Sequence, residues 1–203
     1  MKTNKEYRAA ARQMLGGNIF SETWLCALLP CIIILGINAV LSATQIAGII
    51  LLFIDGALTY GVQYIFLKKA RTGEKMAIED MVKPFTECYA PTLLISLLTG
   101  IFTMLWALLL IVPGIIKAYG YSQAYRIKMD HPEYETMDCL KKSQEMMKGH
   151  KWQLFCLDLS FLGWIIVGCL CLGLGTLWVS AYHEAAVAEF YCDLCEKPIG
   201  IEE

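Results

Sequence analysis

Six ionisable residues interrupt long apolar stretches of this sequence, and their side chains are the best placed to do chemistry. They are Asp55, Lys117, Asp158, His183, Glu184 and Glu189. A charged side chain inside lipid costs about 2.5–3.5 kcal/mol even on a mild insertion scale, so such groups normally face a protein interior or a water-filled cavity. By residue count, Asp55, His183 and Glu184 lie near the middle of their segments. Lys117 lies near an outer edge, and the other two lie near the inner third.

Five of these residues form a candidate intramembrane polar site: Asp55, Lys117, Asp158, His183 and Glu184. In one interpretation, their side chains line a path or pocket for a proton, an ion or a small solute. In the other, they form hydrogen bonds and ion pairs that hold the helices together, with some carboxyl groups protonated. The sequence leaves both interpretations open.

Signatures of catalysis and metal binding are missing from the sequence. It contains no GxSxG elbow, no Walker A loop and no dinucleotide-binding fingerprint. His183-Glu184 begins like the HExxH motif of zinc proteases, but Val187 stands where the second histidine is needed. Cys192-Asp-Leu-Cys195 is a lone CxxC pair with no second pair or histidine partner. We therefore expect a protein that is not an enzyme and that has no cofactor and no metal site.

The elements that would position these residues are apolar helices. The 203 residues are 57% hydrophobic and only 18% charged, and the charge is absent from three long runs, Trp24–Ile54, Cys88–Ile116 and Leu159–Tyr182. About 20 helical residues cross the hydrocarbon core of a bilayer, so each run is long enough to span it. These runs exclude a soluble globular domain, a disordered chain, a disulfide scaffold and a nucleic-acid-binding protein.

Breaks within the apolar regions divide them into about six predicted spans. The breaks lie at Ser42–Gln45, Pro113-Gly114 and Leu172–Gly175, because proline starts helices and glycine favours turns. The predicted spans cover residues 24–43, 46–67, 92–111, 113–129, 152–171 and 176–194. The predicted fold is an all-α, polytopic transmembrane bundle that forms a single domain over residues 1–203. Four spans are the alternative.

The basic residues predict the orientation of this bundle. Sixteen of the 17 lysines and arginines fall on one side when both termini and the two long loops are cytoplasmic, which satisfies the positive-inside rule. Only Lys117 falls towards the outside. Trp24, Trp106, Trp152 and Trp178 lie near span ends, as an aromatic belt requires.

A spacing of 61 residues suggests three tandem units, 1–70, 71–131 and 132–203. It relates Tyr60, Tyr121 and Tyr182, each on the second span of a hairpin. A short amphipathic segment precedes each hairpin, at residues 5–15, 76–83 and 136–148. In the third, we expect Thr136 as the N-cap, Lys148 in the last turn and Gly149 as the stop. Basic amphipathic helices tend to lie among anionic lipid headgroups, and a solvated helix is the alternative.

Small residues four positions apart predict close helix packing. Such spacing recurs at Gly114, Ala118 and Ser122, at Gly120 and Ala124, and at Ala181 and Ala185. In lipid it lets helix backbones approach closely. Tight packing of the fourth and sixth spans is therefore expected rather than a wide pore.

Three stretches resemble a known family: Pro113-GIIKAYGYSQA-Tyr125, Met146-MKGHKWQLFCLDLSFLG-Trp164 and Ala181-YHEAAVAEF-Tyr191. They are similar to the bacterial domain-of-unknown-function 975 family of integral membrane proteins. The likeness extends from about Leu93 onward, and more loosely to the basic N-terminal helix. It implies a bacterial plasma-membrane protein with no assigned activity, distantly similar to the membrane anchor of some glycerophosphodiester phosphodiesterases. The Cys192/Cys195 pair departs from the family pattern.

Two functions are compatible with these observations. The first is a non-enzymatic accessory or scaffold bundle that binds membrane lipids, with anionic headgroups at the amphipathic helices, or a membrane-protein partner. The second is a small transporter or channel that uses the polar site at mid-membrane depth. Neither involves nucleic acid.

Overall fold

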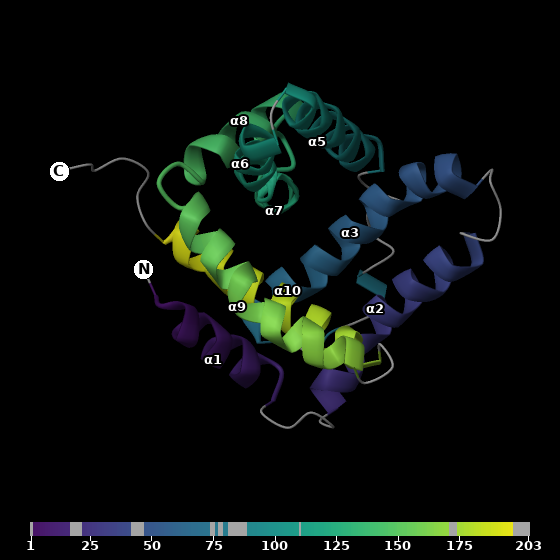
Figure 1. Ribbon diagram of the computed structural model, residues 1–203, viewed down its shortest axis with the longest axis vertical. Coiled ribbons are helices and arrows are strands. Elements are labelled where there is room, and N and C mark those ends of the chain that lie inside the picture. Colours follow the sequence, from purple (N-terminus) through teal and green to yellow (C-terminus); the bar gives the residue numbers. More distant parts are fainter. Residues whose placement is uncertain are drawn as a thin grey trace.

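The computed structural model describes residues 2–16, 22–41, 47–73, 76, 79–80, 89–109, 111–170 and 174–196. Every regular element in these residues is a helix, so the prediction of an all-α fold is confirmed (Figure 1). The helices are α1 (Asn4–Met14), α2 (Glu22–Leu41), α3 (Ala47–Thr72), α5 (Tyr89–Leu109), α6 (Ile111–Tyr121), α7 (Ala124–Asp130), α8 (Thr136–Met146), α9 (Lys151–Leu170) and α10 (Leu174–Cys195).

Helix α10 lies at the centre of the packing. It contacts α1, α2, α3 and α9. Helices α5, α6, α7 and α8 form a second group, which packs together away from α1 and α2 (Figure 1). Helices that are adjacent in sequence pair as α2 with α3, α5 with α6 and α9 with α10. Ala181 and Ala185 of α10 are completely buried, and Gly120 and Ala124 are buried as well. The small-residue spacing therefore marks packed faces, as predicted.

The predicted fourth span, 113–129, is not one helix. It divides into α6 and α7 at Ser122-Gln123, and the 11 residues of α6 are about 16 Å long, roughly half the width of a hydrocarbon core. Side chains satisfy the backbone groups at the break. Ser143 of α8 donates its Oγ hydrogen to the Gly120 carbonyl oxygen at 2.7 Å and accepts from the Gln123 N–H at 3.2 Å. The expectation of a fourth continuous span is wrong.

Two helices in the described parts are long and apolar enough to cross a membrane, at Tyr89–Trp106 of α5 and Lys151–Cys169 of α9. Only 11% and 22% of these stretches are buried. A core helix of a soluble protein would be mostly buried, so these apolar surfaces indicate a membrane association. Six spans were expected, and α2 contributes only a shorter apolar stretch, Thr23–Gly36.

Helix α1 turns its apolar side towards protein. Tyr7, Ala11 and Leu15 are completely buried, and the Tyr7 ring meets Phe190 of α10 edge-on with centroids 5.4 Å apart. The Tyr7 hydroxyl donates to Asp193, and burial together with that carboxylate raises the pKa of Tyr7. The phenol therefore remains a donor at neutral pH. The apolar stripe is therefore used in packing against protein, and contact of the basic side of α1 with lipid headgroups stays a prediction.

Helix α8 is also an amphipathic helix that packs on protein. It begins at Thr136, so Glu135 and not Thr136 is the N-cap, and Lys148 lies beyond its last turn. Gly149 has φ of +82°, a conformation that favours glycine, but it lies three residues beyond Met146, so it is part of the turn before α9 and does not end α8 as predicted. Cys139, Leu140, Ser143 and Met147 are buried. Of the middle amphipathic segment, 76–83, only Met76, Glu79 and Asp80 belong to the described residues.

The three proposed units differ at their shared tyrosine. Tyr60 and Tyr182 lie inside the long helices α3 and α10, whereas Tyr121 is the last residue of α6, at the helix break. The Tyr60 ring does contact Tyr125, with centroids 6.2 Å apart. The tandem repeat stays a prediction, with a middle unit that departs from the other two.

Candidate functional site

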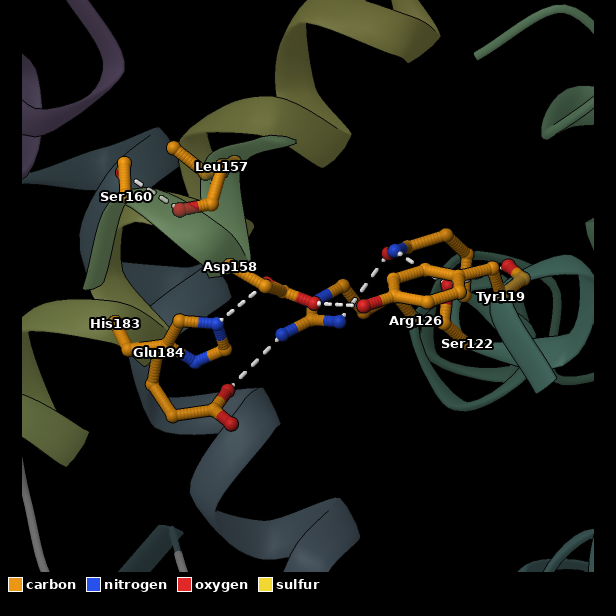
Figure 2. Close-up of polar contacts among 9 residues, drawn as sticks. Tyr119, Ser122, Arg126, Leu157, Asp158, Ser160, His183 and Glu184 are labelled. Atoms are coloured by element: carbon orange, nitrogen blue, oxygen red, sulfur yellow. Dashed lines mark hydrogen bonds and ion pairs between the residues drawn. The ribbon is translucent and has the colours of Figure 1, made fainter. Parts of the chain in front are cut away.

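A polar cluster links α10 to α9 and to the α6–α7 break (Figure 2). The Asp158 carboxylate on α9 is bonded through both oxygens. Its Oδ1 lies 2.8 Å from Nε2 of His183, and its Oδ2 accepts a hydrogen bond of 2.7 Å from the Tyr119 hydroxyl. This first part of the cluster therefore joins α6, α9 and α10 through the single carboxylate of Asp158.

The second part of the cluster is a buried ion pair. Arg126 of α7 donates from Nη2 to Oε2 of Glu184 at 3.0 Å, and from Nη1 to Oε1 of Gln123 at 3.2 Å. The Arg126 side chain is only 2% exposed, against 28% for Glu184. Its Nε has no hydrogen-bond partner among the described residues. A guanidinium this deep in protein needs the carboxylate, because an unpaired buried charge is very costly.

Helix geometry explains why two consecutive residues serve both parts of the cluster. His183 and Glu184 are neighbours on α10, so their side chains leave the helix about 100° apart. His183 meets α9, and Glu184 meets the arginine that follows the α6–α7 break (Figure 2). The break lies between Tyr119 and Arg126, so each short helix contributes one member of the cluster.

The structure brings together three of the five predicted site residues. Asp158 contacts His183 directly, and Glu184 joins the same cluster through its position next to His183 on α10. Lys117 lies elsewhere, with Nζ 3.5 Å from Oε1 of Gln144 and 5.1 Å from the centre of the Trp106 ring. The Asp55 side chain lies outside the described residues, although its backbone belongs to α3.

Sequence reasoning missed Tyr119 and Arg126. Glu189, which was not part of the predicted site, lies 3.7 Å from Lys2 and outside the cluster. The predicted orientation counts Arg126 among the sixteen basic residues on the cytoplasmic side. One signal could have found it, since buried carboxylates at mid-length need a cation and Arg126 is an arginine within an apolar stretch. Because Asp158 and Glu184 both have partners, the geometry favours the interpretation in which the cluster holds helices together.

A pocket of about 450 Å³ lies beside this cluster, between α2, α3 and α10. Glu184 belongs to both the pocket wall and the ion pair. The remaining lining residues are apolar or carry a hydroxyl or thiol: Cys31, Ile34, Leu35, Thr59, Val62, Thr176, Leu177 and Ser180. The pocket therefore combines an apolar wall with a single carboxylate.

The described histidine, cysteine and acidic side chains contain no group of three that could hold a metal ion. Cys192 is half-buried and Cys195 is exposed, and both are free thiols. The CxxC pair therefore belongs to no metal-binding cluster in this part of the chain.

These features define a membrane-associated helical protein in which Asp158, His183, Glu184 and Arg126 pair side chain to side chain. The chain belongs to the family described as Protein of unknown function (DUF975), which it matches over residues 1–119 and 108–197. The resemblance noted in the sequence is thereby confirmed. No curated protein and no solved structure matches the chain.

Proposed function

We propose that this protein is a non-enzymatic bundle of the bacterial plasma membrane that holds a membrane lipid in the pocket between α2, α3 and α10. In this role it is an accessory or scaffold protein. It crosses the membrane several times, with both termini in the cytoplasm. The exposed apolar surfaces of α5 and α9 and the bias of basic residues support this placement.

The pocket is the observation that carries the proposal. Its volume of about 450 Å³ lies within the range of small-molecule sites. Ile34, Leu35 and Val62 offer an apolar wall to an acyl chain. One oxygen of Glu184 is bonded to Arg126, and no hydrogen bond engages its Oε1 in the described part of the chain. That oxygen is an acceptor for a lipid headgroup that donates a hydrogen bond, such as an ammonium or hydroxyl group.

Filling the pocket tests this function. In Thr59→Trp the indole would occupy the space between α2 and α3, so we expect the variant purified in mild detergent to lose the co-purifying lipid. Native mass spectrometry measures the lipid-bound fraction directly. The matched control is Ile166→Trp, which adds the same indole at a position of α9 that is already exposed.

The outcomes of this experiment are distinct. Loss of lipid from Thr59→Trp but not from Ile166→Trp, with both variants folded, supports the pocket. Equal lipid occupancy in both variants contradicts it. Co-purification of a protein instead of a lipid would show that the bundle acts through a membrane-protein partner.

A transporter or channel is the second candidate. It is favoured by one observation, the presence of the ionisable side chains of Asp158, His183 and Glu184 within the otherwise apolar helices α9 and α10. Reconstitution into liposomes tests it, with flux of protons, ions and small solutes as the measurement. For a transporter we expect reproducible flux that disappears in Asp55→Asn or Glu184→Gln at normal folded yield. No flux from the wild-type protein, or loss of folded yield in the variants, would reject this candidate.

A further inference from the structure

Two lysines that are far apart in sequence meet at one place on the molecule. Lys117 of α6 donates to the side chain of Gln144, and Lys151, the first residue of α9, lies beside Gly120 on the same side as Gln144. Lys151 Nζ lies 3.4 Å from the point that a Cβ on Gly120 would occupy, and Gln144 Cγ lies at the same distance from it. The two ammonium groups therefore lie on either side of Gln144, and burial, together with the positive charge of Lys117, lowers the pKa of Lys151.

No carboxylate offsets this repulsion in the described structure. Some of the other basic side chains have acidic partners, as Lys68 has Asp80 and Arg71 has Asp130. Neither Lys117 nor Lys151 has an ion pair among the described residues. The neutral amide of Gln144 is the group that accepts from Lys117. Two adjacent cations without an anion leave a positive charge for a ligand to neutralise.

The surroundings of the pair are aromatic and apolar. The Trp106 ring lies against Lys117, and Trp152, next to Lys151 in the chain, is 72% exposed and stacked on Phe155. Leu105 and Ile116 expose their side chains on α5 and α6. Tryptophan beside a cation at the end of an apolar helix is typical of the level where lipid headgroups lie. A free phosphate ion would make no use of these apolar side chains.

We propose that Lys117 and Lys151 together bind the phosphate of an anionic phospholipid, whose acyl chains lie on the exposed apolar side chains of α5, α6 and α9. The inference rests on the membrane placement proposed above, but it concerns a different site. In the α2–α3–α10 pocket, the Glu184 carboxylate disfavours an anionic headgroup. The positive charges of Lys117 and Lys151, in contrast, favour an anionic headgroup.

Neutralising both lysines tests the site. The probe is phosphatidylglycerol, titrated in competition with phosphatidylcholine against the full-length protein and measured by native mass spectrometry. We expect Lys117→Gln/Lys151→Gln to bind phosphatidylglycerol about 30-fold more weakly, which corresponds to about 2 kcal/mol. The control is Lys141→Gln/Lys148→Gln, which removes the same charge from exposed positions at α8 and should change the affinity less than about threefold.

Folding does not confound this test, because removing like-charge repulsion should leave the lipid-free double variant at least as stable as wild type. Equal weakening in the two double variants would overturn the proposal, as would displacement of the lipid by millimolar inorganic phosphate. The lipid that co-purifies in the α2–α3–α10 pocket, measured in the same spectra, should be unaffected. Loss of lipid at one site with retention at the other therefore separates failure of this inference from failure of the proposed function.

Discussion

Replacing Gly168 with alanine will destabilise the α9–α10 hairpin by about 3 kcal/mol, the upper part of the range for overpacking. A Cβ at position 168 would lie 2.9 Å from the carbonyl carbon of Gly175 and from the nitrogen of Thr176. Both are backbone atoms, so no side-chain rotation can relieve the contact. Gly175 is in the same situation, since its Cβ would lie 2.7 Å from the Gly168 Cα. Thermal unfolding in detergent measures the loss.

Gly163 provides the matched control for this prediction. It lies on the same helix and is exposed, and a Cβ there would meet nothing within 4 Å. Gly163→Ala should therefore be neutral or stabilising by about 0.5–1 kcal/mol, because alanine has the better helix propensity. Equal stability of Gly168→Ala and Gly163→Ala would show that the two helices do not approach each other in this way.

Loss of the Arg126 guanidinium should be nearly as damaging. In Arg126→Met, Glu184 and Gln123 lose their partner, and we expect a cost of about 3 kcal/mol, the low end for a broken buried pair because Glu184 is 28% exposed. For a chain of this length that cost lowers the apparent Tm by about 6–12 °C. Thermal unfolding of the purified protein provides the measurement.

Two further variants show whether burial is the cause. Arg71 makes a two-pronged ion pair with Asp130, including a bond of 2.8 Å, but its side chain is 40% exposed. Arg71→Met should therefore cost no more than about 1 kcal/mol. Adding Glu184→Gln to Arg126→Met removes the stranded charge, so the double variant should recover part of the stability. A cost for Arg126→Met no larger than for Arg71→Met would contradict this account.

The positions of the long helices could be predicted because their physical cause is local. Charge-free runs and breakers at Ser42–Gln45 and Leu172–Gly175 place α2, α3, α9 and α10 to within a few residues. The break between α6 and α7 could not be predicted in this way. It depends on the hydroxyl of Ser143, 20 residues from Gln123, which satisfies backbone groups that a continuous helix would have used itself.

The helical periodicity of apolar residues also does not show whether an apolar face packs against lipid or against protein. The spacing of Tyr7 and Ala11 correctly indicates that one side of α1 is buried, but it does not distinguish lipid from protein. Within the candidate site, Asp158, His183 and Glu184 could be found from their residue types alone. Their contacts depend on Arg126 and Tyr119, which only the tertiary arrangement brings within reach. The same arrangement places Lys117 beside Gln144, in one cluster with Lys151, so the prediction that these two lysines lie on opposite sides of the membrane is wrong.

The packing of α1 against α10 has a consequence for the order in which the protein folds during synthesis. The Tyr182 hydroxyl donates to the Arg8 carbonyl oxygen across 174 positions, and Tyr7 reaches Asp193 across 186. A ribosome makes α1 first and its docking surface last. Helix α1 therefore cannot bury Tyr7 and Leu15 against α10 until nearly the whole chain has been translated. Docking of α1 is then a late step of assembly, because it requires α10 to be in place.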